Sequence, residues 1–95
     1  MRINNQIVDM YSLLKTAQFI GVTKRTVLQW LQHDYIPYPN YKTKNGVLLY
    51  TKEQALMIRK QHRRAKKEGK SLRDQDYVDI LRNEFMKMRS KNEQL

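Results

Sequence analysis

The sequence predicts a mainly α-helical fold with a small β-hairpin, made of three to four helices plus a C-terminal helix. Three observations indicate it: two short amphipathic segments joined at Gly21, an Asn45-Gly46 turn between β-prone runs, and two longer amphipathic segments after residue 50. The 95 residues leave room for one core of ordinary size. Cysteine is absent, so neither a disulfide nor a thiolate metal site supports that core.

The first predicted helix covers residues 13–19. Ser12 is its expected N-cap, because a serine hydroxyl accepts a hydrogen bond from an otherwise unpaired backbone N–H. Leu13, Ala17 and Ile20 recur at helical spacing and form the expected buried stripe. Gly21 follows, and its access to a left-handed conformation predicts that the helix ends there.

The second predicted helix covers residues 24–33, with Thr23 as its N-cap. Val27, Trp30 and Leu31 share one face, which we expect to be buried. Arginine and glutamine are side chains that read guanine and adenine edges in the major groove. The expected base-reading residues are therefore those off the buried face: Thr23, Lys24, Arg25, Leu28, Gln29 and Gln32.

The spacing of the two helices predicts a helix-turn-helix. A small residue, Ala17, stands where the helices cross, Gly21 follows four residues later, and the apolar Val27 six residues after that. The alternative is a plain pair of core helices, with Trp30 as an ordinary core aromatic. We favour DNA reading, because the second helix carries no acidic residue before Asp34.

A β-hairpin is predicted after the helix pair. Residues 35–39 should be extended, since a residue that precedes proline is disfavoured in the helical region. Asn45-Gly46 is a strong signal for a two-residue turn, and a strand is expected over 47–50.

A turn centred on Asn45-Gly46 has a definite consequence for the lysines of the hairpin. It places Lys44 opposite Val47 and Lys42 opposite Leu49, so both lysines share one face near the tip. A basic hairpin beside a reading helix is a wing, here residues 38–50, that contacts the DNA backbone or the minor groove. The alternative is a surface hairpin whose lysines protect its edge. The expected wing contacts are Lys42, Lys44 and Asn45.

The third predicted helix begins at a capping box in residues 51–54 and ends at Gly69. Its inner stripe should comprise Ala55, Ile58, His62 and Ala65. Residues 59–70 contain seven basic side chains and one acid, either a solvated face or a further contact with DNA. The expected backbone contacts are Arg59, Lys60, Arg63 and Arg64.

The final predicted helix follows a cap-like segment, residues 71–74, and runs toward Asn92. A single winged domain should have little core left to cover its apolar stripe, so part of the stripe is expected to be exposed. We therefore predict a weak homodimer or cooperative assembly on DNA. The chain divides into an N-terminal arm (1–10), a DNA-binding domain (11–70) and an association segment (71–95). The expected association residues are Tyr77, Leu81, Phe85 and Met88.

The net charge favours a polyanionic partner. There are 19 Lys and Arg residues against 9 Asp and Glu, a net charge of +10. Nucleic acid is favoured over a membrane surface, because the basic run lacks the broad apolar face that lipid binding needs. No metal or cofactor is expected from two scattered histidines, His33 and His62. With no apolar span and no signal peptide, we expect a cytoplasmic protein.

Residues 11 to about 82 resemble the winged helix-turn-helix of the MerR family and of phage excisionases. The likeness lies in the order of short motifs: Tyr11-Ser12, Gly21-Val22-Thr23, Thr26-Val27, Trp30, Ile36-Pro37, the hairpin, Tyr50-Thr51-Lys52-Glu53 and Gly69-Lys70-Ser71-Leu72. The resemblance implies double-stranded DNA as partner, a bacterial or phage-infected cell, and Lys24, Arg25, Leu28 and Gln29 on the reading surface. The chain departs from the MerR pattern at Leu28 and Leu48, where arginines are usual. No effector-binding extension follows, so no small-molecule effector is expected.

Three classes of function are compared. The favoured hypothesis is a DNA-binding transcriptional regulator or an excisionase-like architectural factor. The alternative is an adaptor or assembly protein, like a small terminase subunit or a polymerase-binding factor, built on the same fold. An enzyme is disfavoured, because residues 10–70 hold only three widely spaced acids, Asp34, Glu53 and Glu68, and metal-dependent nucleases need convergent carboxylates.

Overall fold

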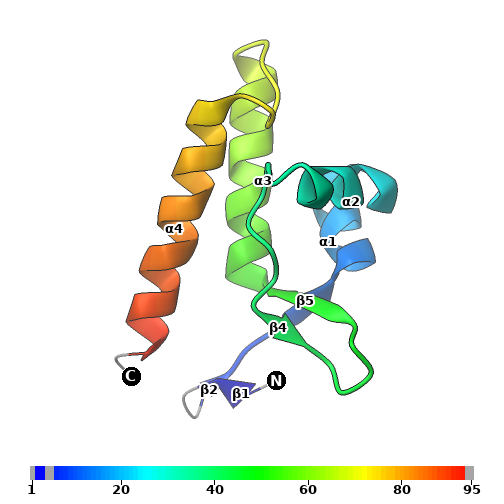
Figure 1. Ribbon diagram of the computed structural model, residues 1–95, viewed down its shortest axis with the longest axis vertical. Helices are drawn as coiled ribbons and strands as arrows, with labels where there is room; N and C mark the ends of the chain where they lie inside the picture. Colours follow the sequence, from blue (N-terminus) through cyan, green and yellow to red (C-terminus); the bar gives the residue numbers. More distant parts are fainter. Residues whose placement is uncertain (1, 4–5, 94–95) are drawn as a thin grey trace.

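The computed structural model describes residues 2–3 and 6–93, and it is mainly helical with a small antiparallel sheet (Figure 1). The helices are α1 (Leu13–Ile20), α2 (Lys24–Gln32), α3 (Lys52–Lys67) and α4 (Gln75–Glu93). The strands are β1 (Arg2–Ile3), β2 (Gln6–Ile7), β3 (Met10–Ser12), β4 (Tyr41–Lys42) and β5 (Leu48–Thr51). Residues 1, 4 and 5 of the predicted arm, and 94 and 95 of the predicted association segment, lie outside the described residues. The architecture is compatible with a winged-helix class.

The caps of α1 and α2 are those that the sequence predicts. Ser12 Oγ accepts a hydrogen bond from the backbone N–H of Lys15 at 3.1 Å, and Thr23 Oγ1 accepts one from Thr26 at 3.2 Å. Gly21 adopts φ 93°, a left-handed conformation that favours glycine and ends α1. The second helix ends one residue earlier than predicted, because His33 is its C-cap.

The first strand of the main sheet was not predicted. The sheet has the order β3-β5-β4, with Tyr11 of β3 opposite Tyr50 of β5. Met10, which we assigned to the N-terminal arm, pairs with Thr51. A strand of three residues is too short to show an alternating pattern, and its partner lies far along the chain. Local sequence therefore contained no signal for it.

The predicted register of the hairpin is wrong by one residue. Lys42 lies opposite Leu48, not Leu49, and the turn is wider than two residues. The backbone N–H of Thr43 donates to the carbonyl of Val47 at 2.9 Å. Gly46, at φ 83°, takes the left-handed position that closes a three-residue loop. Lys44 consequently lies in the turn and does not share a strand face with Lys42.

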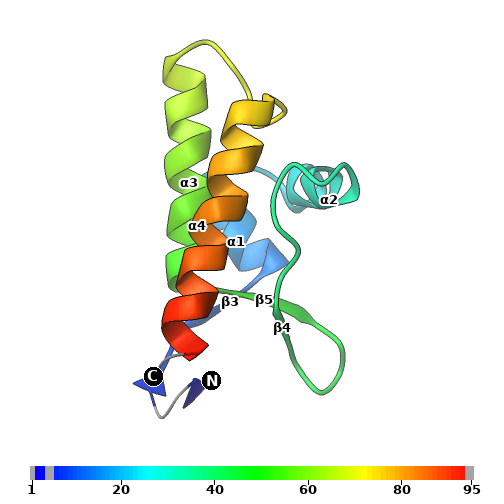
Figure 2. The same ribbon diagram turned by 60° about the vertical axis from the view of Figure 1, so that its left-hand side comes forward.

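The third and fourth helices form an antiparallel pair, with α1 and α2 on the other side of α3 (Figures 1 and 2). The capping box at Thr51 and Gln54 is present. Leu81 is completely buried between the helices, and Phe85 packs edge-on against Tyr50. The buried cluster that joins both helices to the helix pair is Leu13, Ala17, Ile20, Val27, Trp30, Ile36, Tyr50, Ile58, Ala65, Leu72, Tyr77, Leu81 and Phe85.

This packing overturns the expected exposure of the α4 stripe. Tyr77, Leu81 and Phe85 are buried in the core of their own chain, and Met88 is half-buried. The prediction failed because it assumed that the core was complete without α4. In the structure, α3 has two sides to cover, and α4 covers one of them.

Candidate nucleic-acid interface

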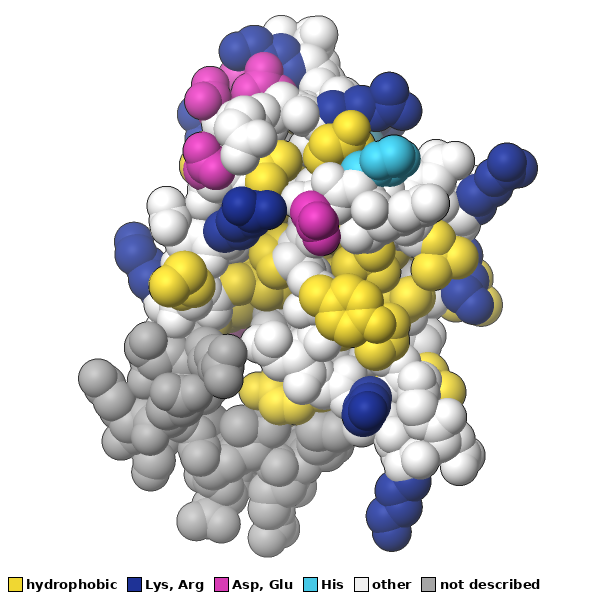
Figure 3. Space-filling model, in the orientation of Figure 1, with side chains coloured by type: hydrophobic (Ala, Val, Ile, Leu, Met, Phe, Trp, Pro, Cys, Tyr) yellow, Lys and Arg dark blue, Asp and Glu magenta, His cyan; other side chains and the backbone are white. Residues whose placement is uncertain are grey.

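The outward face of α2 gathers every residue that the sequence assigned to base reading. Val27 and Trp30 bury the inner face. The exposed side chains are Thr23, Lys24, Arg25, Leu28, Gln29 and Gln32. Figure 3 shows Lys and Arg side chains projecting over α2 at the right-hand edge and over the wing at the lower right. The helix therefore presents two cations, two amides and one exposed leucine, with no acidic residue among them.

Contacts at its C-terminal end hold α2 in place. The indole ring of Trp30 lies 5.4 Å from the imidazole of His62 on α3. Burial lowers the pKa of His62, and the nearby charge of Lys66 lowers it further; both effects favour the neutral imidazole. The carbonyl of Trp30 also accepts a hydrogen bond from the backbone N–H of Tyr35 at 2.8 Å. These contacts fix the orientation of the outward face relative to α3.

The wing residues are exposed as expected, although their register differs. Lys42, Lys44 and Asn45 all lie at the surface of the hairpin. The hydroxyl of Tyr50 donates a hydrogen bond to the carbonyl of Pro37, which ties the extended segment after α2 to β5. This bond explains how the wing is positioned relative to the reading helix.

The four predicted backbone contacts of α3 do not form one group. Lys60 and Arg63 are exposed. Arg59 is half-buried, with its guanidinium carbon 4.7 Å from the centre of the Phe19 ring on α1. Arg64 instead forms an ion pair with Glu68, Nε to Oε1 at 3.2 Å. Of these four residues, Lys60 and Arg63 therefore remain without the ring contact of Arg59 or the ion pair of Arg64.

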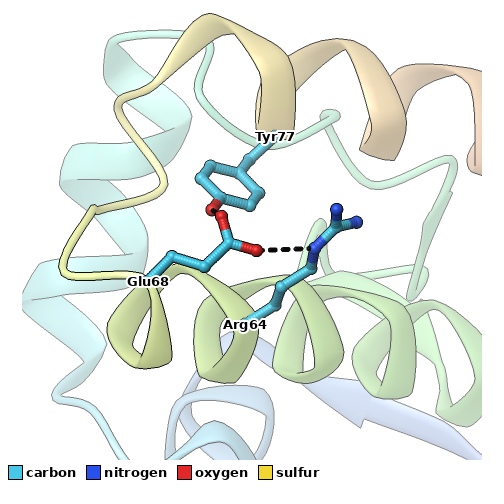
Figure 4. A network of polar contacts seen from close by, with 3 residues as sticks. All are labelled: Arg64, Glu68 and Tyr77. Carbon is cyan, nitrogen blue, oxygen red and sulfur yellow. Dashed lines mark hydrogen bonds and ion pairs between the residues drawn. The ribbon is translucent and has the colours of Figure 1, made fainter.

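Arg64 belongs to a polar cluster at the turn between α3 and α4. Glu68 accepts hydrogen bonds from Arg64 and from the hydroxyl of Tyr77, which comes from α4 (Figure 4). The hydrogen bond from Tyr77, together with Arg64, lowers the pKa of Glu68. The same bond, with burial and the negative charge of Glu68, raises the pKa of Tyr77 to about 12. The cluster connects the end of α3 to the start of α4, a role that the sequence analysis did not assign to Arg64.

Sequence reasoning assigned no role to several other exposed cations, among them Lys15, Lys52 and Lys67. Lys15 on α1 lies 4.4 Å from the centre of the Tyr11 ring, while Lys52 and Lys67 lie on the outward side of α3. Helical periodicity could have placed Lys52 and Lys67 beside Lys60. Lys67 belongs to the basic run 59–70, but the contacts expected from that run were confined to residues 59–64, and Lys52 lies before the run.

Within residues 2–3 and 6–93, no group of three or more His, Cys, Asp or Glu side chains is arranged to hold a metal ion. None of the described helices has the length and apolar character needed to cross a membrane.

Comparison of the chain with family models, curated proteins and solved structures returned no match.

Proposed function

We propose that the protein binds double-stranded DNA in a sequence-specific way, as a winged helix-turn-helix of the MerR-like or excisionase-like kind. It would act as a transcriptional regulator or as an architectural factor in recombination. One observation carries the proposal: the exposed face of α2 presents Lys24, Arg25, Gln29 and Gln32 together, opposite the buried Val27 and Trp30.

The residue types on this face fit the edges of base pairs. Arg25 can donate two hydrogen bonds to guanine, and Gln29 can pair with adenine in the major groove. Leu28, which is 45% exposed between them, can contact the methyl group of thymine. The wing lysines, Lys42 and Lys44, would neutralise phosphates beside the groove, which adds affinity without base preference.

The test begins with selection of bound duplexes from a random DNA pool by the purified protein. Arg25→Ala with Gln29→Ala should then weaken binding to the selected site, because each good base contact contributes roughly 1–3 kcal/mol. Arg73→Ala with Asn83→Ala is the matched control, since it removes one guanidinium and one amide from exposed positions away from α2. Equal affinity of both double variants for the selected site would refute the proposal.

The wing should contribute differently. Lys42→Ala with Lys44→Ala should weaken binding to all duplexes about equally and reduce the log–log salt slope by up to about two. A loss confined to the selected site would show that the wing reads bases.

One observation supports the alternative, an adaptor or assembly protein. A hollow of about 220 Å³ between residues 37–40 and α4 is lined by Pro37, Asn40, Arg82, Phe85 and Met86. Met86 is 67% exposed there, so an apolar contact surface is present away from α2. Met86→Glu should leave DNA binding unchanged if the protein acts on DNA alone. An adaptor that uses this hollow would lose its partner instead.

A further inference from the structure

One face of α3 carries exposed positive charge that is not part of the DNA-binding surface proposed for α2 and the wing. We call it the outer α3 face, and its exposed members are Lys52, Leu56, Lys60, Arg63 and Lys67. Four of these are cations, and one carboxylate, Glu53, lies at the edge of the face. Four positive charges and one negative charge leave +3 on the face. A shallow hollow of about 310 Å³ on this side is lined by Leu56, Arg59, Lys60 and Arg63.

The packing of α3 determines where this face points. His62 lies against Trp30, so it marks the side of α3 that is turned toward α2. Successive residues of an α-helix are rotated by about 100°. Lys60 and Lys67 are therefore about 160° and 140° away from His62 around the helix axis. Both point away from α2.

The outward face of α2, which carries the expected base-reading residues and is called the reading face below, also points away from its neighbouring helix. Trp30 marks the side of α2 toward α3, and Arg25 and Gln32 lie about 140° and 160° from it around the helix. Trp30 and His62 consequently lie between the two helices, with Arg25 on the far side of α2 and Lys60 on the far side of α3. Arg25 and Gln32 on α2 and Lys60 and Lys67 on α3 are therefore turned away from each other, toward opposite sides of the protein.

One straight duplex cannot touch both sides. The persistence length of duplex DNA is about 50 nm, and the longest extent of the protein is 41 Å. A duplex that occupies α2 and the wing therefore continues past the molecule rather than turning around it. The charge on the outer α3 face remains available to a separate polyanion.

We propose that the outer α3 face binds the phosphate backbone of a second DNA duplex, so that the protein joins two DNA segments. The proposal rests on the proposed function, which supplies the first segment through α2 and the wing. Lys60, Arg63 and Lys67 rise along the helix by about 4.5 and 6 Å, a row of cations suited to a strand of phosphates. This row offers cations for phosphates and no amide for adenine, so we expect the second segment to be bound mainly through its backbone.

The chemistry of the face favours DNA over an anionic membrane. Leu56 is the large hydrophobic residue exposed on it, at 43%. A helix that lies on a lipid surface needs a broad apolar face to insert beneath the headgroups. A row of cations around one leucine provides charge without that insertion.

The test is capture of one duplex by another. A duplex with the selected site is fixed to beads and loaded with protein, and a labelled duplex of unrelated sequence is then added. The wild type should retain the labelled duplex. Lys60→Glu with Arg63→Glu and Lys67→Glu should lower that retention by about tenfold or more at low salt, where screening is weakest. The control, Arg73→Glu with Arg82→Glu and Lys87→Glu, changes the net charge equally at exposed positions of the α3–α4 turn and α4.

The outcomes separate the two proposals. Protection of the selected site from nuclease cleavage reports binding through α2 and the wing. This inference assigns Lys60 and Arg63 to the second duplex and not to the first, so the triple variant of the outer α3 face should keep that protection. Arg25→Ala with Gln29→Ala should lose protection of the selected site. If this variant still binds the labelled duplex through the outer α3 face, the inference is upheld. Capture by the α3 variant equal to that of the wild type would overturn it. Absence of capture by the wild type, with binding to phosphatidylserine vesicles instead, would also overturn it and assign the face to a membrane.

Discussion

Leu81→Ala tests whether α4 belongs to the core of the domain. Leu81 is completely buried between α3 and α4, in the same cluster as Ile58 and Phe85. Truncation to alanine removes its buried carbon atoms and leaves a cavity, which in a well-packed site costs about 2.7–5 kcal/mol. A domain of 95 residues has a free energy of unfolding of about 5–14 kcal/mol. The substitution should therefore remove a large part of the stability.

The measurement is urea unfolding, followed by circular dichroism and by the fluorescence of Trp30, the single tryptophan. With a slope of roughly 1–3 kcal/mol per molar urea, the midpoint should fall by roughly 1–5 M. Met86→Ala is the control on the same helix, because Met86 is 67% exposed, and it should change stability by no more than about 0.5 kcal/mol. The midpoints should not depend on protein concentration, since the buried stripe is covered within one chain.

The opposite result has a clear meaning. If Leu81→Ala unfolds at the same urea concentration as Met86→Ala, and at the same time reduces the mass seen by sedimentation, the stripe joins two chains. The assignment of Leu81 to the core of its own chain would then be wrong.

Three further predictions concern single contacts. Glu68→Gln should bring the pKa of Tyr77 down from about 12 toward its ordinary value of 10, which carbon NMR of the phenol ring measures; an unchanged pKa would exclude Glu68 as the cause of the shift. In the wild type, the stability from the hydrogen bond between Tyr77 and Glu68 is complete below pH 10 and lost as the pH rises through about 12. His62 has a lowered pKa, so its contribution to stability should be complete above pH 6.5 and be lost as the pH falls below that value. Because Trp30 lies 5.4 Å from His62, its fluorescence should follow this titration, and His62→Gln should abolish the change. Gly46→Ala should destabilise the protein by about 1 kcal/mol in thermal unfolding, because its φ of 83° strains any side chain; a stability equal to that of the wild type would mean that the turn has rearranged.

Features whose physical cause lies within a few residues were predictable from the sequence. The caps at Ser12 and Thr23, the left-handed Gly21 and the capping box at Thr51 each depend on side chains and backbone groups within one helical turn. The buried and exposed sides of α2 follow from helical periodicity alone, because the rotation per residue is constant. The expected reading residues were for this reason placed correctly on the exposed face.

Features that depend on which distant segments meet were decided by the tertiary structure. Strand β3 exists because Tyr11 pairs with Tyr50, and the hairpin register follows from the left-handed Gly46, which allows a wider loop than Asn45-Gly46 suggested. An apolar stripe has the same pattern whether it covers its own core or a partner, so only the packing of α4 on α3 placed Leu81 inside. The direction of the basic residues of α3 was likewise hidden in the sequence. The sequence shows that α3 is basic but not which way its basic residues point relative to α2. The contact of Trp30 with His62 fixes that direction.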